Sequence, residues 1–202
     1  CRDIDGKRLE LYDLELEIYK SNNDLTLVVT KLNFPDEPML WCGPKNLWMD
    51  GKTVDASPRI MLKKQIQNLS KRNLKMKSGV ECEYFLLSDD GKSISDPKDI
   101  QSKPCYDQSA LMRRYELIKE ICDCMIELGW NPYQNDHEDA NGQFEMNWDY
   151  SDSLITADRH TFFKFMVKSL AEKHGLRATF MPKPFENLTG NGCHAHISLW
   201  NG

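Results

Sequence analysis

Polar side chains, most of them acidic or imidazole, recur at every second position in three separate segments of this 202-residue chain. They are Glu81 and Glu83 in GVECEYFLL, Gln143 and Glu145 in GQFEMNWDY, and His194, His196 and Ser198 in GCHAHISLW. If these faces converge, carboxylates and an imidazole gather at one place, and such a cluster is stable only around divalent cations. Ligation dominated by oxygen, with one histidine, suits Mg²⁺ or Mn²⁺ better than structural zinc, which prefers thiolate and imidazole.

A further carboxylate, Glu138, lies in the polar, turn-like run DHEDANG just before Glu145. We expect Glu138 to reach Glu145 from the preceding loop. Acids that meet in this way repel each other unless something positive lies between them. Two divalent cations commonly clamp a transferring phosphoryl group, offset its charge and hold the attacking and leaving oxygens in line. The pattern therefore favours a two-metal phosphoryl-transfer site, although a Glu-x-Glu pair taken alone is more often simply exposed to solvent.

The three segments have the period of β-strands, because apolar residues alternate with the polar ones. The first strand is expected at residues 79–87. In the second, the side chains expected to face the core are Phe144, Met146, Trp148 and Tyr150. In the third, the apolar face is expected to hold Cys193, Ala195, Ile197 and Leu199. Each strand should thus be apolar on one face and present its polar and ionisable side chains on the other.

Three helices are expected around these strands. One begins at Ser57-Pro58 and runs to about Lys75, and its many lysines are interpreted as a solvated face rather than a nucleic-acid or membrane site. After a loop at 88–108, a second helix starts at Ser109, keeps helical spacing through Met112 and Tyr115, and stops at Gly129. The third runs from about Leu154 to Lys173. Its packing residues are expected to be Phe162, Phe163, Phe165, Met166, Val167 and Leu170.

The first 50 residues carry the strand-like runs LELYDLELEIY and DLTLVVTKL, followed by the turn-rich FPDEP and WCGPKN. This pattern indicates a small, mostly β unit. The opening DIDGK is superficially like a calcium loop, but the later ligands and the closing Glu are missing. A hairpin turn at Asp5-Gly6 is therefore favoured. Strands and helices together predict an α+β protein.

Composition narrows the class of protein. With 40% hydrophobic residues the chain can bury a core, and a net charge of −5 argues against a nucleic-acid partner. No apolar run has the length of a membrane span, and no signal peptide is visible, so we expect a cytoplasmic protein. Seven irregularly spaced cysteines are expected to be reduced thiols, and Cys122-x-Cys124 within a helix argues against zinc. The chain starts at Cys1 without Met and stops just after a strand, so we expect it to be a segment of a longer protein.

The segments GVECEYFLL, DHEDANGQFE and ATFMPKPFENLTGNGCHAHISLW, in that order, resemble the glutamine synthetase superfamily. Within that superfamily, the glutamate-amine ligase branch, the γ-glutamylmethylamide synthetase type, is most similar to the residue sequences of DHEDANGQFE and ADRHTFFKFMVKSLAEKHGLRATFMPKPF. The resemblance is dense from about Ser57 to Trp200. It implies a catalytic domain at residues 55–202, whose mainly antiparallel sheet carries the metal site beside flanking helices. A partial β-grasp-like unit at residues 1–54 would precede it.

The resemblance also implies a role for each acidic residue of the expected cluster. Glu83, Glu138 and Glu145 match the positions that hold a first metal, near the glutamate and amine site. Glu81 and His194 match two ligands of a second metal, which carries the ATP phosphates. Two or more Mg²⁺ or Mn²⁺ ions at each site, with ATP as co-substrate, are therefore implied.

Substrate positions follow from the same resemblance. Gly190 matches the glycine whose backbone helps to hold glutamate, and Thr189 stands where many members have Asn, which bears on substrate preference. His196, Ser198 and, with a weaker match, Tyr150 match positions that contact the nucleotide.

The reaction implied is the ATP-dependent joining of ammonia or a methylamine-like amine to the γ-carboxylate of glutamate, through a γ-glutamyl phosphate. Members assemble into homo-oligomeric rings. The family's third ligand of the second metal, its phosphate-clamping arginines and its acidic loop would all lie beyond Gly202, so the catalytic groups are expected there. The 202 residues alone are then a metal-binding half site, and inactive.

Two other interpretations remain open at this point. The chain could come from a catalytically silent relative that binds metal and nucleotide or only assembles, as it would if Gly202 were the natural end. A two-metal phosphatase also fits the metals, but it does not explain the glycine-rich loop before Cys193.

Overall fold

A computed structural model describes residues 18–20, 26–28, 32–33, 38–39 and 57–202 of the chain. The chain divides into two compact units, Cys1–Gln65 and Ile66–Gly202, which are described separately. The expected turn at Asp5-Gly6 lies outside the described residues, and the proposed boundary between residues 54 and 55 stays a prediction.

The described part of the first unit contains two short antiparallel pairs. Strand β1 (Ile18–Lys20) pairs with β2 (Thr26–Val28), and β3 (Leu32–Asn33) pairs with β4 (Pro38–Met39). Strand β2 falls within the second run expected to form a strand, and β1 overlaps the end of the first.

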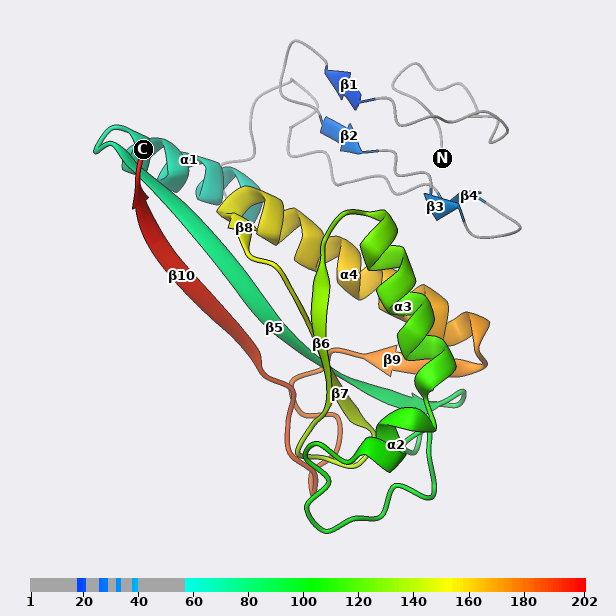
Figure 1. The fold of residues 1–202 in the computed structure, drawn as a ribbon. Helices are drawn as coiled ribbons and strands as arrows, with labels where there is room; N and C mark the ends of the chain where they lie inside the picture. Colours follow the sequence, from blue (N-terminus) through cyan, green and yellow to red (C-terminus); the bar gives the residue numbers. More distant parts are fainter. Residues whose placement is uncertain (1–17, 21–25, 29–31, 34–37, 40–56) are drawn as a thin grey trace. The chain divides into compact units, whose positions relative to one another are not determined.

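The second unit is built on a six-stranded sheet in which every pairing is antiparallel. The strand order is β10-β5-β7-β6, and β8 and β9 pair with β5 as well (Figure 1). The strands are β5 (Leu74–Ser88), β6 (Pro132–His137), β7 (Gln143–Trp148), β8 (Ser151–Asp152), β9 (Leu176–Thr179) and β10 (Cys193–Asn201). The predicted α+β class with a mainly antiparallel sheet is confirmed.

Strand β5 is the centre of this sheet and is longer than predicted. It begins at Leu74 rather than Gly79, because β10 pairs with its first nine residues, from Leu74 to Cys82. Figure 1 shows β10 running beside that half of β5. The other half pairs with β7 and then with β9, and the residues from Cys82 to Leu87 are all buried.

Two expected helices are found close to their predicted positions. Helix α4 (Ser153–Lys173) agrees with the prediction and is followed by Gly175 at φ +67°. Helix α1 (Pro58–Ser70) begins as predicted but ends before Lys75. Asn73 takes a left-handed conformation (φ +58°) after the helix, and Lys75 belongs to β5, opposite Trp200. None of the described helices has the length and apolar character needed to cross a membrane.

The single helix predicted from Ser109 to Gly129 is wrong, because two helices replace it: α2 (Gln108–Met112) and α3 (Tyr115–Glu127). The Asp107 side chain caps α2 by accepting from the Ser109 amide at 2.9 Å. At the break, Arg113 pairs with Asp96, and Arg114 Nε donates to Ser95 Oγ at 2.9 Å. The two arginines tie the break to the loop that follows β5, and Met112 and Tyr115, which were predicted to keep the spacing of one helix, are exposed.

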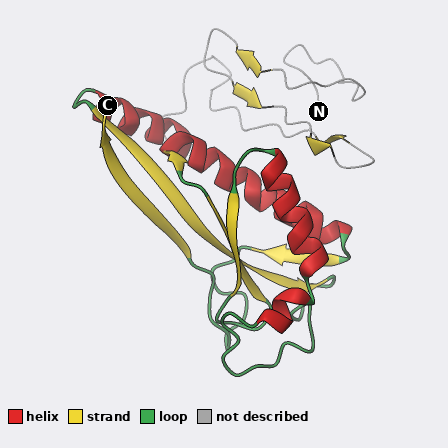
Figure 2. Ribbon diagram, viewed as in Figure 1, coloured by secondary structure: helices red, strands yellow, loops and turns green. Residues whose placement is uncertain are grey.

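Helices α3 and α4 lie next to each other and cover one face of the sheet (Figure 2). The core there is aromatic: Phe163 is fully buried, and its ring centroid lies 4.9 Å from that of Trp148 and 6.2 Å from that of Tyr84. Phe165, expected to pack with the other α4 residues, is 39% exposed, and Tyr150, expected in the core, is 56% exposed because β7 ends at Trp148. Rings packed in this way contribute beyond the area they bury.

The opposite face of the sheet is covered only in part. Near the end of β5, Phe85 and Leu87 pack with Ala140 and with partly buried side chains of two loops, Ile94 and Phe185. Alternation places Glu81 and Glu83 on this same face, beyond the apolar cover. The acidic part of the face therefore lies outside this apolar cover.

Candidate functional site

The strand register brings the predicted acidic residues together. Glu83 of β5 stands directly opposite Glu145 of β7, and Glu81 stands opposite His194 of β10. Directly opposed side chains on one face of an antiparallel pair lie about 5 Å apart at Cβ. Three strands that are distant in sequence therefore present their charged groups at one point.

These groups line a pocket of about 270 Å³. Donor atoms of Glu81, Glu145 and His194 all lie within 4.8 Å of one another, a separation that one metal ion can span. The pocket is lined by Glu81, Glu83, Tyr106, Tyr133, Gln134, Asp136, Glu138, Glu145, Asn147 and His194. All five side chains predicted to bind metal are among them.

The carboxylates of this pocket repel one another electrostatically. Burial, followed by the charges of Glu145 and Glu83, raises the pKa of Glu138 to about 7. Burial also raises the pKa of Glu145, and Glu81 and Glu83 raise it further against the effect of a hydrogen bond from Asn147. Among the described residues that line the pocket, none is lysine or arginine. A divalent cation would relieve this repulsion, so the donor set fits Mg²⁺ or Mn²⁺.

Glu81 is paired with both histidines of β10. Its Oε2 lies 3.0 Å from His194 Nδ1, and its Oε1 lies 2.9 Å from His196 Nε2. The hydrogen bond to Glu81 raises the pKa of His194. Both imidazoles are exposed, so they can turn away from Glu81 toward a ligand at little cost in packing.

Glu83 is held rigidly, unlike Glu81. It is buried, and its Oε2 accepts from Gln143 Nε2 at 2.8 Å and from the Gly192 amide at 2.8 Å. Two donors to one carboxylate oxygen restrict the orientation of the side chain. A side chain at residue 192 would place Cβ 2.6 Å from Glu83 Oε1, so only glycine allows this approach.

The glycine-rich loop that precedes β10 contains the two residues predicted to bind glutamate. At Gly190 a Cβ atom would lie 2.4 Å from the carbonyl oxygen of Pro182, so its missing side chain serves close backbone packing. Gln143 Nε2 also donates to the Gly190 carbonyl at 3.0 Å, which links this loop to Glu83. Thr189 is exposed, and neither Thr189 nor Gly190 lines the pocket. Their role toward substrate stays a prediction.

The residues predicted to contact nucleotide lie along β10 and beside it. Tyr150 stacks on Trp200, with ring centroids 6.5 Å apart and planes at 21°, and Trp200 Nε1 donates to Ser198 Oγ at 2.9 Å. The ammonium of Lys77 lies 4.7 Å from the Trp200 ring centroid. His196, next to Ser198 on this face, is bound to Glu81 as described above. This places an exposed aromatic and cationic surface beside the acidic pocket.

Sequence reasoning missed half of the pocket residues: Tyr106, Tyr133, Gln134, Asp136 and Asn147. Asp136 and Glu138 were interpreted as part of the turn-like run DHEDANG, but β6 runs from Pro132 to His137 and includes Gln134, and Asp136 pairs with Glu145. Their spacing of two was a usable strand signal. Lys77 could have been found in the same way, because it lies four residues before Glu81 on β5 and alternation therefore places both on one face. Tyr106 has no such signal, since its place depends on a left-handed turn (φ +63°) in a loop.

The cysteines form no metal site in the described residues. Cys122 and Cys124 lie on α3, where Cys122 Sγ accepts from Asn135 Nδ2 at 3.1 Å. Cys82 and Cys193 face each other across β5 and β10, and a hydrogen bond from Cys82 lowers the pKa of Cys193 to about 6. The five described cysteines are free thiols, whereas Cys1 and Cys42 lie outside the described residues.

Comparison with known proteins agrees with the family resemblance seen in the sequence. The family model described as the glutamine synthetase catalytic domain matches residues 55–202, and a model for a domain of unknown function matches residues 1–76. A glutamine synthetase of Rhizobium meliloti (strain 1021) is 67% identical over 153 residues, which are 76% of this chain and 35% of that protein. A glutamate–methylamine ligase of Methyloversatilis universalis is 42% identical over 154 residues, 75% of this chain and 35% of that protein.

A solved structure also resembles the chain. The ligand-free structure of GmaS aligns with a TM-score of 0.74 and 64% identity, covering 75% of this chain and 36% of that one. The chain thus spans about a third of the length of the curated relatives it matches. The family model covers most of the sequence, including every residue of the acidic pocket, and the chain belongs to the family defined by the glutamine synthetase catalytic domain.

Proposed function

We propose that the protein carrying this chain is an ATP-dependent ligase that joins ammonia or a small amine to the γ-carboxylate of glutamate, through a γ-glutamyl phosphate. The observation that carries the proposal is the pocket in which Glu81, Glu83, Glu138, Glu145 and His194 converge from three strands and a loop. Relatives named glutamine synthetase and glutamate–methylamine ligase support the same class of reaction.

In this proposal Glu83, Glu138 and Glu145 hold one divalent cation, and Glu81 and His194 contribute to a second. The raised pKa values of Glu138 and Glu145 support it, because side chains that resist ionisation together are stabilised by a shared cation. Bound Mg²⁺ or Mn²⁺ would supply the positive charge that lets two anions, a phosphate and a carboxylate, come together.

The chain's own residues prepare the pocket for that role. Gln143 and the Gly192 amide hold the Glu83 carboxylate in place at the pocket. Asn147 Nδ2 donates to Glu145 Oε1 at 2.8 Å, which fixes the carboxylate opposite Glu83. Carboxylates held in this way need little reorganisation when a ligand binds.

The surface beside the pocket is proposed to receive the nucleotide. His196, Ser198 and Tyr150 would contact ATP, and the loop at Thr189 and Gly190 would hold glutamate. We further propose that the complete protein assembles as a homo-oligomeric ring. The choice between ammonia and methylamine is part of the experiment below, because the named relatives include enzymes of both kinds.

The test is phosphate release from ATP by the complete protein with glutamate, Mg²⁺ or Mn²⁺, and either ammonia or methylamine. Release that depends on both glutamate and one of the amines is expected, and the faster amine names the nucleophile. A folded protein that binds Mn²⁺ but releases no phosphate would overturn the ligase and favour a silent relative. Release from phosphate monoesters without glutamate would instead favour a phosphatase.

The metal assignment has its own test in Glu83→Ala. Mn²⁺ affinity should fall sharply, measured by titration calorimetry. Glu127→Ala is the matched control, because Glu127 is an exposed glutamate near the end of α3, away from the pocket lining. Equal Mn²⁺ affinity in the two variants contradicts the placement of the metal.

A further inference from the structure

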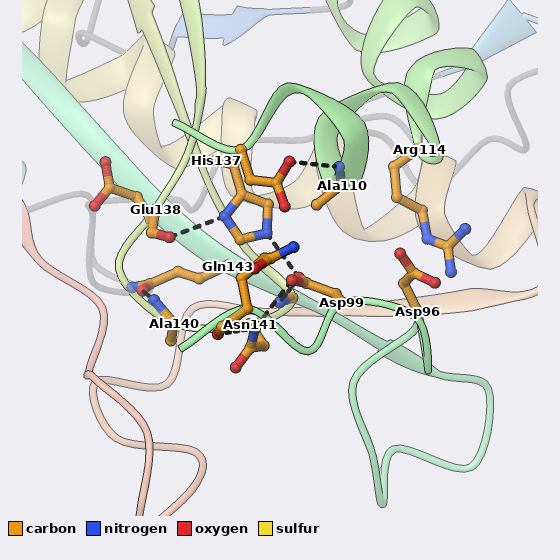
Figure 3. Close-up of polar contacts among 12 residues, drawn as sticks. Asp96, Asp99, Ala110, Arg114, His137, Glu138, Ala140, Asn141 and Gln143 are labelled. Carbon is orange, nitrogen blue, oxygen red and sulfur yellow. Dashed lines mark hydrogen bonds and ion pairs between the residues drawn. The ribbon is translucent and has the colours of Figure 1, made fainter. Parts of the chain in front are cut away.

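A buried acid–imidazole pair lies behind the pocket, outside the set of proposed ligands. His137 Nε2 is 2.7 Å from Asp99 Oδ2, and the two side chains are 0% and 1% exposed. His137 ends β6, whereas Asp99 comes from the loop after β5, 38 residues earlier. Figure 3 shows the His137 ring between Asp99 and the main chain of Glu138. A buried polar pair costs desolvation and persists only where further hydrogen bonds compensate.

Those further bonds all come from the short loop between β6 and β7. Asp99 Oδ2 also accepts from the Gly142 amide at 2.6 Å, and Asp99 Oδ1 accepts from Asn141 Nδ2 at 3.0 Å. The other ring nitrogen of His137, Nδ1, donates to the Glu138 carbonyl at 2.9 Å. The pair therefore fastens both the beginning and the end of residues 138–142.

This loop carries the groups on which the pocket depends. Glu138 is its first residue, and the Glu138 amide donates to the Gln143 carbonyl at 2.9 Å. The Ala140 amide donates to Gln143 Oε1 at 3.1 Å, which turns the Gln143 amide nitrogen toward Glu83. A shift of the loop would thus displace Glu138 directly and would release Glu83 from one of its two donors.

Gly142 shows how closely the loop is fitted. Its φ is +76°, and a Cβ atom there would lie 2.7 Å from the Cβ of Ile94, on the same long loop that supplies Asp99. The Gly142 carbonyl accepts from the Leu86 amide at 2.9 Å. The loop lies between β5 and residues 94–101, and Asp99 bonds to its end directly and to its beginning through His137.

We propose that Asp99 and His137 are positioning residues for the metal pocket: they set the place of Glu138 and, through Gln143, the orientation of Glu83. This inference rests on the proposed function, since it takes Glu83 and Glu138 as metal ligands. Groups that orient ligands in this way typically change metal affinity by about 10- to 100-fold when they are altered.

A matched control stands on the same loop. Asp96 is also buried and lies, like Asp99, on the loop that follows β5, but its ion pair is with Arg113 at the break between α2 and α3 rather than with residues 138–142. Figure 3 shows Asp96 beside Arg114 and apart from His137. If Asp99 only stabilised the loop that follows β5, Asp99→Asn and Asp96→Asn would have the same effects. If Asp99 positions the metal ligands, only Asp99→Asn should change metal affinity.

The experiment compares the complete wild-type protein, Asp99→Asn and Asp96→Asn in three measurements: Mn²⁺ affinity by calorimetry, the unfolding temperature, and hydrogen exchange of the peptide covering residues 138–143. We expect Asp99→Asn to weaken Mn²⁺ binding by about 10- to 100-fold and to speed exchange in that peptide. Asp96→Asn should leave both at the wild-type level, even if its unfolding temperature falls as far.

Asp99→Asn with wild-type Mn²⁺ affinity and wild-type exchange overturns the proposal, as does an equal loss of affinity in both variants. If Asp99→Asn does not fold, Asn141→Ala removes one donor while it leaves the pair intact, and it should show the same effects at smaller size. Wild-type affinity and exchange in that variant overturn the proposal equally. A wild-type protein that binds no Mn²⁺ would refute the proposed function itself, while the exchange measurement still decides whether Asp99 holds the loop.

Discussion

The two faces of the main sheet are made by the same strands and have opposite character. On the face covered by α3 and α4, Tyr84, Phe144 and Phe163 pack with almost no exposed surface. On the other face, Glu81, Glu83 and Glu145 come from neighbouring positions of the same strands and repel one another. We infer that packing on the helix-covered face supplies most of the folding free energy. The acidic face opposes folding until a cation binds.

The largest effect is expected from Phe163→Ala on the helix-covered face. Phe163 is fully buried against the rings of Tyr84, Trp148 and Phe180. Its removal should lower the free energy of unfolding by about 3–5 kcal/mol. Urea unfolding measures this, and Mn²⁺ affinity below the transition should not change. A loss below about 1 kcal/mol would mean that this face does not carry the stability.

The next effect is expected from Glu145→Gln on the acidic face, with opposite signs for binding and stability. Mn²⁺ affinity should fall more than about 100-fold, which is about 2.7 kcal/mol. Without metal, the variant should be more stable than the wild type, because burial and the charges of Glu81 and Glu83 disfavour ionised Glu145. Calorimetry and urea unfolding in EDTA measure the two quantities. A variant that is less stable in EDTA would contradict the view that this face opposes folding.

A smaller effect concerns pH. The pKa of Glu138 is raised in the folded protein to about 7, from 4.5. The stabilising effect of protonated Glu138 is therefore fully present below pH 4.5 and is lost as the pH rises through about 7. His194, whose pKa is also raised, changes stability in the same direction. Urea unfolding in EDTA across this range should show a steeper decline for the wild type than for Glu138→Gln. Parallel curves would rule out the contribution of Glu138.

The smallest effect is expected from Tyr84→Phe. The Tyr84 hydroxyl is buried among the helix-covered rings and has no hydrogen-bond partner in the described part of the chain, and burial raises the pKa of Tyr84. Removing an unsatisfied polar atom while keeping the ring should raise the free energy of unfolding by about 1 kcal/mol. Thermal unfolding checks this against the wild type. A clear loss of stability would show that the hydroxyl has a partner, such as a bound water.

Much of the candidate site was predictable from local pattern. The alternation in GVECEYFLL and in CHAHISLW assigned Glu81, Glu83 and His194 to single faces, and Pro58 and Gly175 marked a helix start and a helix end correctly. The run DHEDANG was misinterpreted as a turn because its composition is that of a loop, although its first two residues belong to β6. The break between α2 and α3 was missed, since it depends on the contacts that Arg113 and Arg114 make with residues 95 and 96.

Sequence alone determined which side chains share a face, because the direction of each Cβ follows from backbone geometry that is local to the strand. Only the tertiary structure decided that Glu83 meets Glu145 and that His194 meets Glu81, because the register of strands is set by contacts between residues far apart in the chain. The burial of Asp99 against His137 is of the same kind. Nothing near either residue in the sequence indicates the pair, since each polar side chain is buried against a partner 38 residues away in the chain.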